Sequence, residues 1–85
     1  MPLEQLIGEV ASHLDLKETS IISASRKREI SEARGIICYL AVNDLGYSTS
    51  EVGRSLSINR ENAGRCALRG KKVLEKYTDL SDIVN

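Results

Sequence analysis

The sequence has no Phe and no Trp, and only three Tyr among its 85 residues. A core without large aromatic side chains must be built from Leu, Ile, Val and Ala. Such a core suits packed helices better than a sheet, which favours aromatic and β-branched strands. The chain length allows one hydrophobic core and no more. We therefore expect a single all-α domain.

Residues that hold metals or form disulfides are also scarce. The sequence has one histidine, His13, and two cysteines, Cys38 and Cys66, which lie within apolar helical patterns. A structural zinc site needs about four ligands. We therefore expect no metal site and no cofactor, and both cysteines are predicted to be free, reduced residues of the core.

Long apolar runs and a basic leader are absent as well. No segment approaches the ~20 apolar residues of a membrane span, and the N-terminus is acidic, unlike that of a secretory signal. The sequence also has no Cys–His pair in a plausible frame and no Gly-rich phosphate loop. We expect a cytoplasmic protein that is not an enzyme and makes no membrane contact.

The charge is balanced overall but unevenly distributed. The formal net charge is zero, yet residues 1–24 carry −3, residues 25–77 carry +5 and residues 78–85 carry −2. A basic central and C-terminal region is compatible with a nucleic-acid surface on one side of the domain. The same distribution also fits an ordinary solvated face.

Apolar residues recur at helical spacing in four segments of the chain. These segments predict helices at about residues 3–14, 28–45, 49–56 and 60–77. Residues 19–24 fit either a helical turn or an extended piece. We expect the folded domain to span residues 1–77 and residues 78–85 to form a flexible tail.

Three signals mark the ends of these helices. Gly46 is suited to the left-handed residue that closes a helix, because it has no Cβ. Ser48 and Glu51 have the spacing of a capping box, in which each side chain bonds the backbone of the other. Asn59 is a good N-cap for the last helix.

Residues 48–77 have the pattern of a helix-turn-helix. Gly53 is predicted to lie where the two helices approach each other closely, a place where Ala is still expected to fit. Ser57 opens a short turn, and Ile58 fills the core directly after it. Small, turn and apolar residues at these offsets are typical of the motif, although a plain helical hairpin can share them.

The outward face of the last predicted helix is basic. Asn62, Arg65 and Arg69 lie at i, i+3 and i+7, on one line of that face. Arginine can bridge guanine O6 and N7, and asparagine can bridge adenine N6 and N7. The residues expected to face DNA from this helix are Asn59, Arg60, Asn62, Arg65, Arg69 and Lys72.

A second set of residues is expected to hold the DNA backbone. It combines a basic group at the entry and in the first part of the second long helix, Arg26, Lys27, Arg28 and Arg34, with Ser48 and Arg54 at the motif's first helix. Together the two sets predict sequence-specific binding to double-stranded DNA. The alternative is a helical module for protein interaction or dimerisation, and the sequence does not indicate an oligomeric state.

A family resemblance follows from the segment EARGIICYLAVNDLGYSTSEVGRSL. It resembles the C-terminal DNA-binding domain of the bacterial replication initiator DnaA, with Arg34, Leu40, Ala41, Val52 and Gly53 in the family's characteristic places. The resemblance covers about residues 3–74 and implies a helical domain with a Trp-repressor-like helix-turn-helix. It also implies DNA binding.

The last helix departs from the initiator pattern. It opens with Arg60-Glu61-Asn62-Ala63-Gly64, where the family has an Asp-His-Ser/Thr-Thr-Val signature, and Glu32 stands where the family often has an arginine. The chain is also similar to the C-terminal tails of transposases associated with repetitive extragenic palindromes, through SRKREISEARGIICYLA and the stretch from Gly64 to Gly70. That likeness implies the DNA-targeting part of a transposase-like protein.

Overall fold

The structure is a computed structural model that describes residues 1–22 and 27–77. Its described residues are helical apart from short connections, so the predicted all-α fold is confirmed. The elements are α1 (Leu3–Leu14), α2 (Glu18–Ile22), α3 (Arg28–Tyr39), the π-helical turn η1 (Leu40–Asp44), α4 (Thr49–Leu56) and α5 (Arg60–Leu74). The ambiguous segment at residues 19–24 is helical as far as Ile22. The predicted tail at 78–85 lies outside the described residues.

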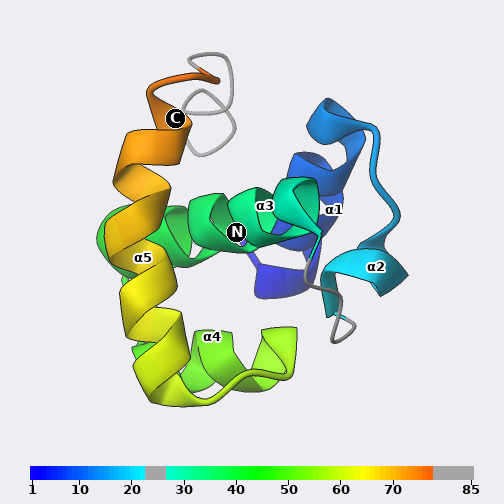
Figure 1. Cartoon of the computed structure of the whole chain (residues 1–85). Coiled ribbons are helices and arrows are strands. Elements are labelled where there is room, and N and C mark those ends of the chain that lie inside the picture. Colours follow the sequence, from blue (N-terminus) through cyan, green and yellow to red (C-terminus); the bar gives the residue numbers. More distant parts are fainter. Residues whose placement is uncertain (23–26, 78–85) are drawn as a thin grey trace.

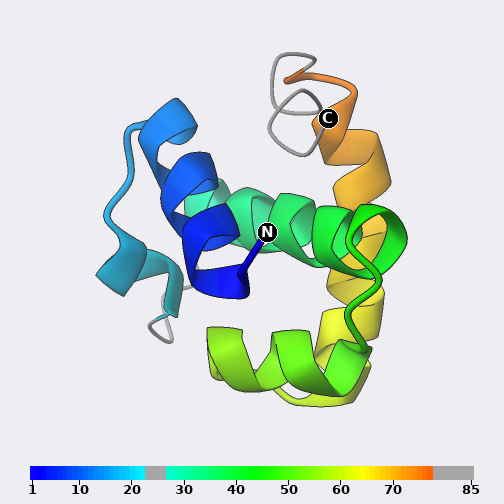
Figure 2. The same cartoon turned by 180° about the vertical axis from the view of Figure 1, so that it is seen from behind.

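Helix α3 lies at the centre of the molecule. Figure 1 shows it crossing between α5 on one side and α1 and α2 on the other, with α4 beneath. Figure 2, the view from behind, shows α1 crossing in front of the N-terminal part of α3. The core is aliphatic, as the lack of large aromatic residues requires, and its fully enclosed larger side chains are Leu6, Val10, Ile21, Ile36, Ile37, Cys38, Leu40, Val52 and Leu56.

The second long helix was predicted to run to about Leu45, and the chain is helical from Arg28 as far as Asp44, but its last turn is not an α turn. The α-helix ends at Tyr39, and Leu40–Asp44 form a π-helical turn in which the Leu45 amide donates to the Leu40 carbonyl at 3.1 Å. A π turn holds one residue more than an α turn, and the apolar spacing alone does not reveal that addition. Gly46 then adopts the predicted left-handed conformation, with a φ of 78°.

Both predicted N-caps are confirmed. The Ser48 hydroxyl accepts from the Glu51 amide at 3.1 Å, and a Glu51 carboxylate oxygen accepts from the Ser48 amide at 2.8 Å. At the start of α5, the Asn59 side-chain oxygen accepts from the Asn62 amide at 2.8 Å. Each cap satisfies backbone N–H groups that have no partner within the helix.

The end of α5 was predicted at Tyr77, but the helix ends at Leu74. Beyond it, the amides of Lys76 and Tyr77 bond to the carbonyls of Val73 and Leu74, three residues back. These are tight turns rather than α-helical bonds. Lys76 is nevertheless held near α3, since its ammonium lies 3.6 Å from a carboxylate oxygen of Glu32.

Candidate nucleic-acid interface

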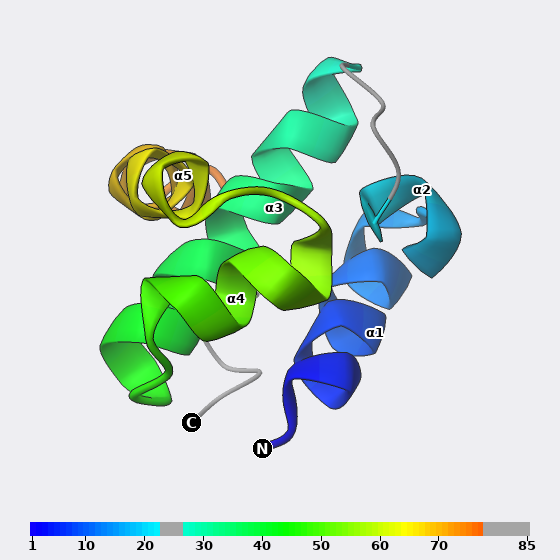
Figure 3. The ribbon, with the colours of Figure 1, turned by 90° about the horizontal axis from the view of Figure 1, so that it is seen from below.

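Helices α4 and α5 form the predicted helix-turn-helix (Figure 3). The turn is tight because Ser57 adopts a left-handed conformation, with a φ of 60°, and the Ile58 amide donates to the Gly53 carbonyl at 2.8 Å. A Cβ on Gly53 would lie 2.7 Å from the Ile58 carbonyl oxygen. The expectation that Ala fits at this position is therefore wrong: Gly53 contacts the backbone of the turn, which cannot easily move.

Helix α5 packs against α3 at two glycines, Gly70 on α5 and Gly35 on α3. A Cβ on Gly35 would lie 3.3 Å from both the Cys66 carbonyl oxygen and the Gly70 Cα, and a Cβ on Gly70 would overlap the Gly35 carbonyl. The two backbones therefore touch directly. This contact fixes α5 by its inner flank and leaves the opposite flank to solvent.

The angle between α3 and α5 encloses a basic pocket. It has a volume of about 260 Å³ and is lined by Ser31, Arg34, Ile58, Asn62, Arg65, Cys66 and Arg69. The three residues predicted to lie on one line of the last helix thus share one concave surface. Asn62, Arg65 and Arg69 are exposed, so their polar groups are available to a ligand.

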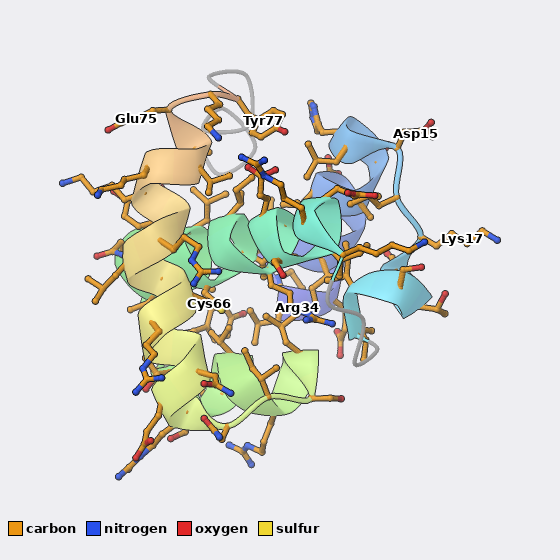
Figure 4. The ribbon with its side chains drawn as sticks, viewed as in Figure 1. Asp15, Lys17, Arg34, Cys66, Glu75 and Tyr77 are labelled. Atoms are coloured by element: carbon orange, nitrogen blue, oxygen red, sulfur yellow. The ribbon has the colours of Figure 1, made fainter. Side chains whose placement is uncertain are left out.

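Arg34 reaches the basic pocket from α3, but it also has a structural contact. Its Nε donates to the Ile21 carbonyl at 2.8 Å, which joins the end of α2 to α3. Figure 4 shows Arg34 on the lower side of α3 and Cys66 on α5 beside α3. Part of the Arg34 hydrogen-bonding capacity is therefore used within the protein, which the sequence pattern did not indicate.

The remaining predicted residues are more dispersed. Arg60 and Lys72 are exposed on α5, and Lys27 and Arg28 are exposed at the start of α3. Arg54 lines a different pocket with Leu3 and Tyr47, so it does not join the basic pocket. The Ser48 hydroxyl and amide are engaged in the capping box. Arg26 lies outside the described residues.

Both cysteines are free, as predicted, but only Cys38 is fully buried. Cys66 is half-buried and opens into the basic pocket. A hydrogen bond from the Cys38 thiol, followed by the charges of Arg69 and Arg34, lowers the pKa of Cys66 to about 6. The same hydrogen bond and burial raise the pKa of Cys38. Cys66, which lies beside the two arginines, is therefore the more acidic thiol of the pair.

Two features were not among the predicted site residues. Ser31 lines the basic pocket from α3, and its place there depends on how α3 and α5 cross, which no local pattern reveals. Leu68 is 79% exposed on α5, and its outward position is visible from the helical spacing. An exposed leucine on the helix expected to face DNA can contact the methyl group of thymine.

Residues 1–22 and 27–77 contain no group of three or more His, Cys, Asp or Glu placed to hold a metal ion. Within the same ranges, no helix has the length and apolar character needed to cross a membrane.

Comparison with known proteins points to one family. Residues 3–60 match the family described as Bacterial dnaA protein helix-turn-helix. The chromosomal replication initiator protein DnaA of Bacteroides thetaiotaomicron is 38% identical over 61 residues, which are 72% of this chain and 13% of that protein. DnaA of Bacteroides fragilis is 36% identical over 61 residues, again 72% of this chain and 13% of that protein. DnaA of Ureaplasma parvum is 39% identical over 54 residues, which are 64% of this chain and 12% of that protein. No solved structure gives a significant match.

Proposed function

Since the chain belongs to the bacterial DnaA helix-turn-helix family, we propose that it binds double-stranded DNA sequence-specifically through α5. Membership in the family implies DNA binding. The observation that carries the finer proposal is the basic pocket, where Asn62, Arg65 and Arg69 of the motif's second helix meet Arg34 of α3. Such a set combines the donors that read bases with the charge that attracts phosphate.

In this proposal the exposed flank of α5 enters the major groove, as the second helix of the motif does in general. Arg65 and Arg69 bond guanine edges, and Asn62 bonds adenine. Lys27, Arg28 and Arg60 hold phosphate and set the position of the protein along the duplex. The same phosphate role extends to Arg26, Arg34, Ser48 and Arg54, and Asn59 and Lys72 also face the duplex from the α5 side.

The base preference proposed here differs from that of the initiators. The family match ends at residue 60, whereas the proposed reading residues lie further along α5. The helix opens with Arg60-Glu61-Asn62-Ala63-Gly64. Different donors and acceptors on the reading helix select different base edges, so a distinct target sequence follows.

The chain spans about an eighth of the length of the DnaA relatives that it matches. We propose that residues 1–77 act as one DNA-targeting unit, because α1 to α5 share one core. Initiator relatives favour a role in an initiator-like protein. The likeness of the stretch from Gly64 to Gly70 to transposase tails keeps a transposase-like protein as the second proposal.

The test begins with selection of duplexes from a random pool, followed by binding measurements on the enriched site. The triple variant Asn62→Ala, Arg65→Ala, Arg69→Ala should lose its preference for that site over a scrambled duplex. Lys17→Gln, an exposed change far from α5, is the matched control and should bind like wild type. A triple variant that retains the preference would show that α5 does not read the bases.

A salt series separates this proposal from the interaction-module alternative. DNA affinity should fall steeply as salt rises, because each neutralised phosphate releases counterions. If no duplex is enriched and binding to a protein partner shows little dependence on salt, the interaction module is the better explanation.

A further inference from the structure

The two cysteines lie at the tightest contact between α3 and α5. Cys38 follows Gly35 on α3 by one helical turn, and Cys66 precedes Gly70 on α5 by one turn. The backbones of the two glycines touch, and a Cβ on Gly35 would lie 3.3 Å from the Cys66 carbonyl oxygen. The two cysteines therefore lie on the helical turns that adjoin this close backbone approach.

The Cys38 thiol donates a hydrogen bond to the Cys66 sulfur. The two sulfur atoms therefore already face each other across the helix contact, although both residues are free. A disulfide needs two cysteines whose β-carbons point toward each other on closely spaced backbones. The α3–α5 contact brings Cys38 and Cys66 together on two helices whose backbones touch.

The two thiols differ in accessibility and charge. Cys38 is 0% exposed, whereas Cys66 opens into the basic pocket beside Arg34 and Arg69. A thiolate is the reactive form of cysteine, and nearby cations favour it. The chain thus contains one accessible, activated thiol with an enclosed second thiol behind it. This arrangement is a common form of redox-sensitive cysteine pair.

We propose that Cys66 is a peroxide-reactive cysteine and that Cys38 resolves its oxidised form into a disulfide between α5 and α3. The Cys66 thiolate attacks one peroxide oxygen, the O–O bond breaks, and hydroxide leaves as Cys66 becomes a sulfenic acid. The Cys38 sulfur then attacks the Cys66 sulfur. The S–S bond forms, and the sulfenic hydroxyl leaves as water with the Cys38 proton. The two thiols supply the two electrons that reduce the peroxide.

This chemistry does not depend on DNA binding, so the two proposals stand or fall separately. The test treats the full, reduced chain with a small excess of hydrogen peroxide at neutral pH. Denaturation with iodoacetamide then caps the remaining thiols, and trypsin releases the peptides at residues 35–54 and 66–69. These two peptides should be joined by a disulfide, with the loss of two hydrogens, and dithiothreitol should separate them.

The proposal would be overturned if a peroxide treatment that oxidises free glutathione left Cys38 and Cys66 reduced, so that iodoacetamide caps both. Cross-links found only between two molecules would overturn it as well. Peroxide added to the chain unfolded in guanidinium is the internal control. Unfolding separates Cys66 from the folded arrangement of the Arg34 and Arg69 side chains. The oxidation of Cys66 should therefore slow to the rate of an ordinary thiol.

Variants divide the reaction into its two steps. In Cys38→Ala the first step remains, so dimedone should trap Cys66 as a sulfenic acid and no linked peptides should form. In Cys66→Ala the enclosed Cys38 should resist peroxide. Circular dichroism checks that both variants stay helical. A Cys38 that oxidises as fast in Cys66→Ala as Cys66 does in wild type would contradict the assigned order.

A further pair of variants retains both cysteines and so remains informative if a cysteine variant unfolds. Arg69→Gln removes a cation beside Cys66 and should slow the reaction with peroxide several-fold. Lys17→Gln removes an exposed cation on the other side of α3 and should leave the rate unchanged. Equal rates in the two variants would show that the basic pocket does not activate the thiol.

Discussion

Helices α1–α4 differ from helix α5 in how far the family match covers them and in how their side chains are buried. The family match covers residues 3–60 and so ends at the first residue of α5. Within the matched region, most apolar side chains fill the common core. Along α5, the buried residues are Ala63, Ala67, Gly70 and Val73, and most of the others are exposed. The residues that match the family therefore mainly form the packed core. The surface proposed to read DNA consists of exposed residues, on which core packing imposes little constraint.

The small residues of α5 make this separation possible. Ala63, Ala67 and Gly70 seat the helix by close backbone approach rather than by interlocking large side chains. Substitutions on the opposite flank do not disturb that seating. A change of target sequence can therefore be accommodated without a change of fold.

The largest effect is expected from a variant that adds a methyl group at the contact between α3 and α5. Gly70→Ala should destabilise the domain by about 1–3 kcal/mol, because the new Cβ overlaps the Gly35 carbonyl and the helices must move apart. Gly64→Ala on the same helix is the matched control. It meets nothing within 4 Å and should stabilise by up to about 1 kcal/mol.

Urea denaturation followed by circular dichroism measures both variants. A Gly70→Ala protein as stable as Gly64→Ala would mean that α5 is not seated on α3 by backbone contact.

The next test compares a residue proposed to read bases with one proposed to hold phosphate. Arg65→Ala should cost about 1–3 kcal/mol on the selected duplex and relax the preference at one base pair. Arg28→Ala should weaken binding to every duplex and reduce the salt slope by about 1. Fluorescence anisotropy at several salt concentrations measures both. Identical profiles for the two variants would contradict the division of roles.

The two N-caps sharpen the comparison further. Ser48→Ala and Asn59→Ala should each lower stability by about 1 kcal/mol, since each leaves a helix-start N–H without its side-chain partner. Asn59→Ala should weaken DNA binding more than Ser48→Ala does at a temperature where both variants are folded, because the Asn59 cap orders the first turn of α5. Thermal melting and anisotropy on the same samples distinguish the two effects. Equal DNA affinities would place the start of α5 away from the duplex.

The smallest expected effect is a pH dependence at the start of α4. Hydrogen bonds from the Ser48 amide and hydroxyl hold the pKa of Glu51 below its usual range. Its stabilising contribution is therefore complete above the ordinary carboxylate pKa and is lost as the pH falls through the lowered value. The difference in Tm between wild type and Glu51→Gln should shrink on acidification. A constant difference would mean that the carboxylate charge contributes nothing to the cap.

Local patterns predicted much of the fold. Helices α1 and α4, both N-caps and the left-handed Gly46 depend on residues close in the sequence, and the structure has them where the patterns indicated. The π turn at Leu40–Asp44 was missed because one added residue barely changes the apolar spacing. The end of α5 was misplaced because Tyr77 keeps helical spacing even though the chain beyond Leu74 turns more tightly.

Contacts between distant residues were the least predictable part of the candidate site. The convergence of Asn62, Arg65 and Arg69 follows from the geometry of one helix and was predicted. The bond from Arg34 to the Ile21 carbonyl and the meeting of Cys38 with Cys66 join separate elements. They depend on the crossing of α3 with its neighbours, and no spacing along the chain encodes that crossing.

Acidic α1 and α2 lie across α3 from basic α5 (Figure 1). The first 22 residues carry four carboxylates against one lysine, whereas α5 carries five cationic side chains and one carboxylate. A molecule with no net charge but with separated charges behaves as an electric dipole. Near a polyanion it experiences a torque as well as a force, effective within the screening length of ~8 Å at physiological salt. The domain should therefore rotate its α5 side toward the duplex before contact is made.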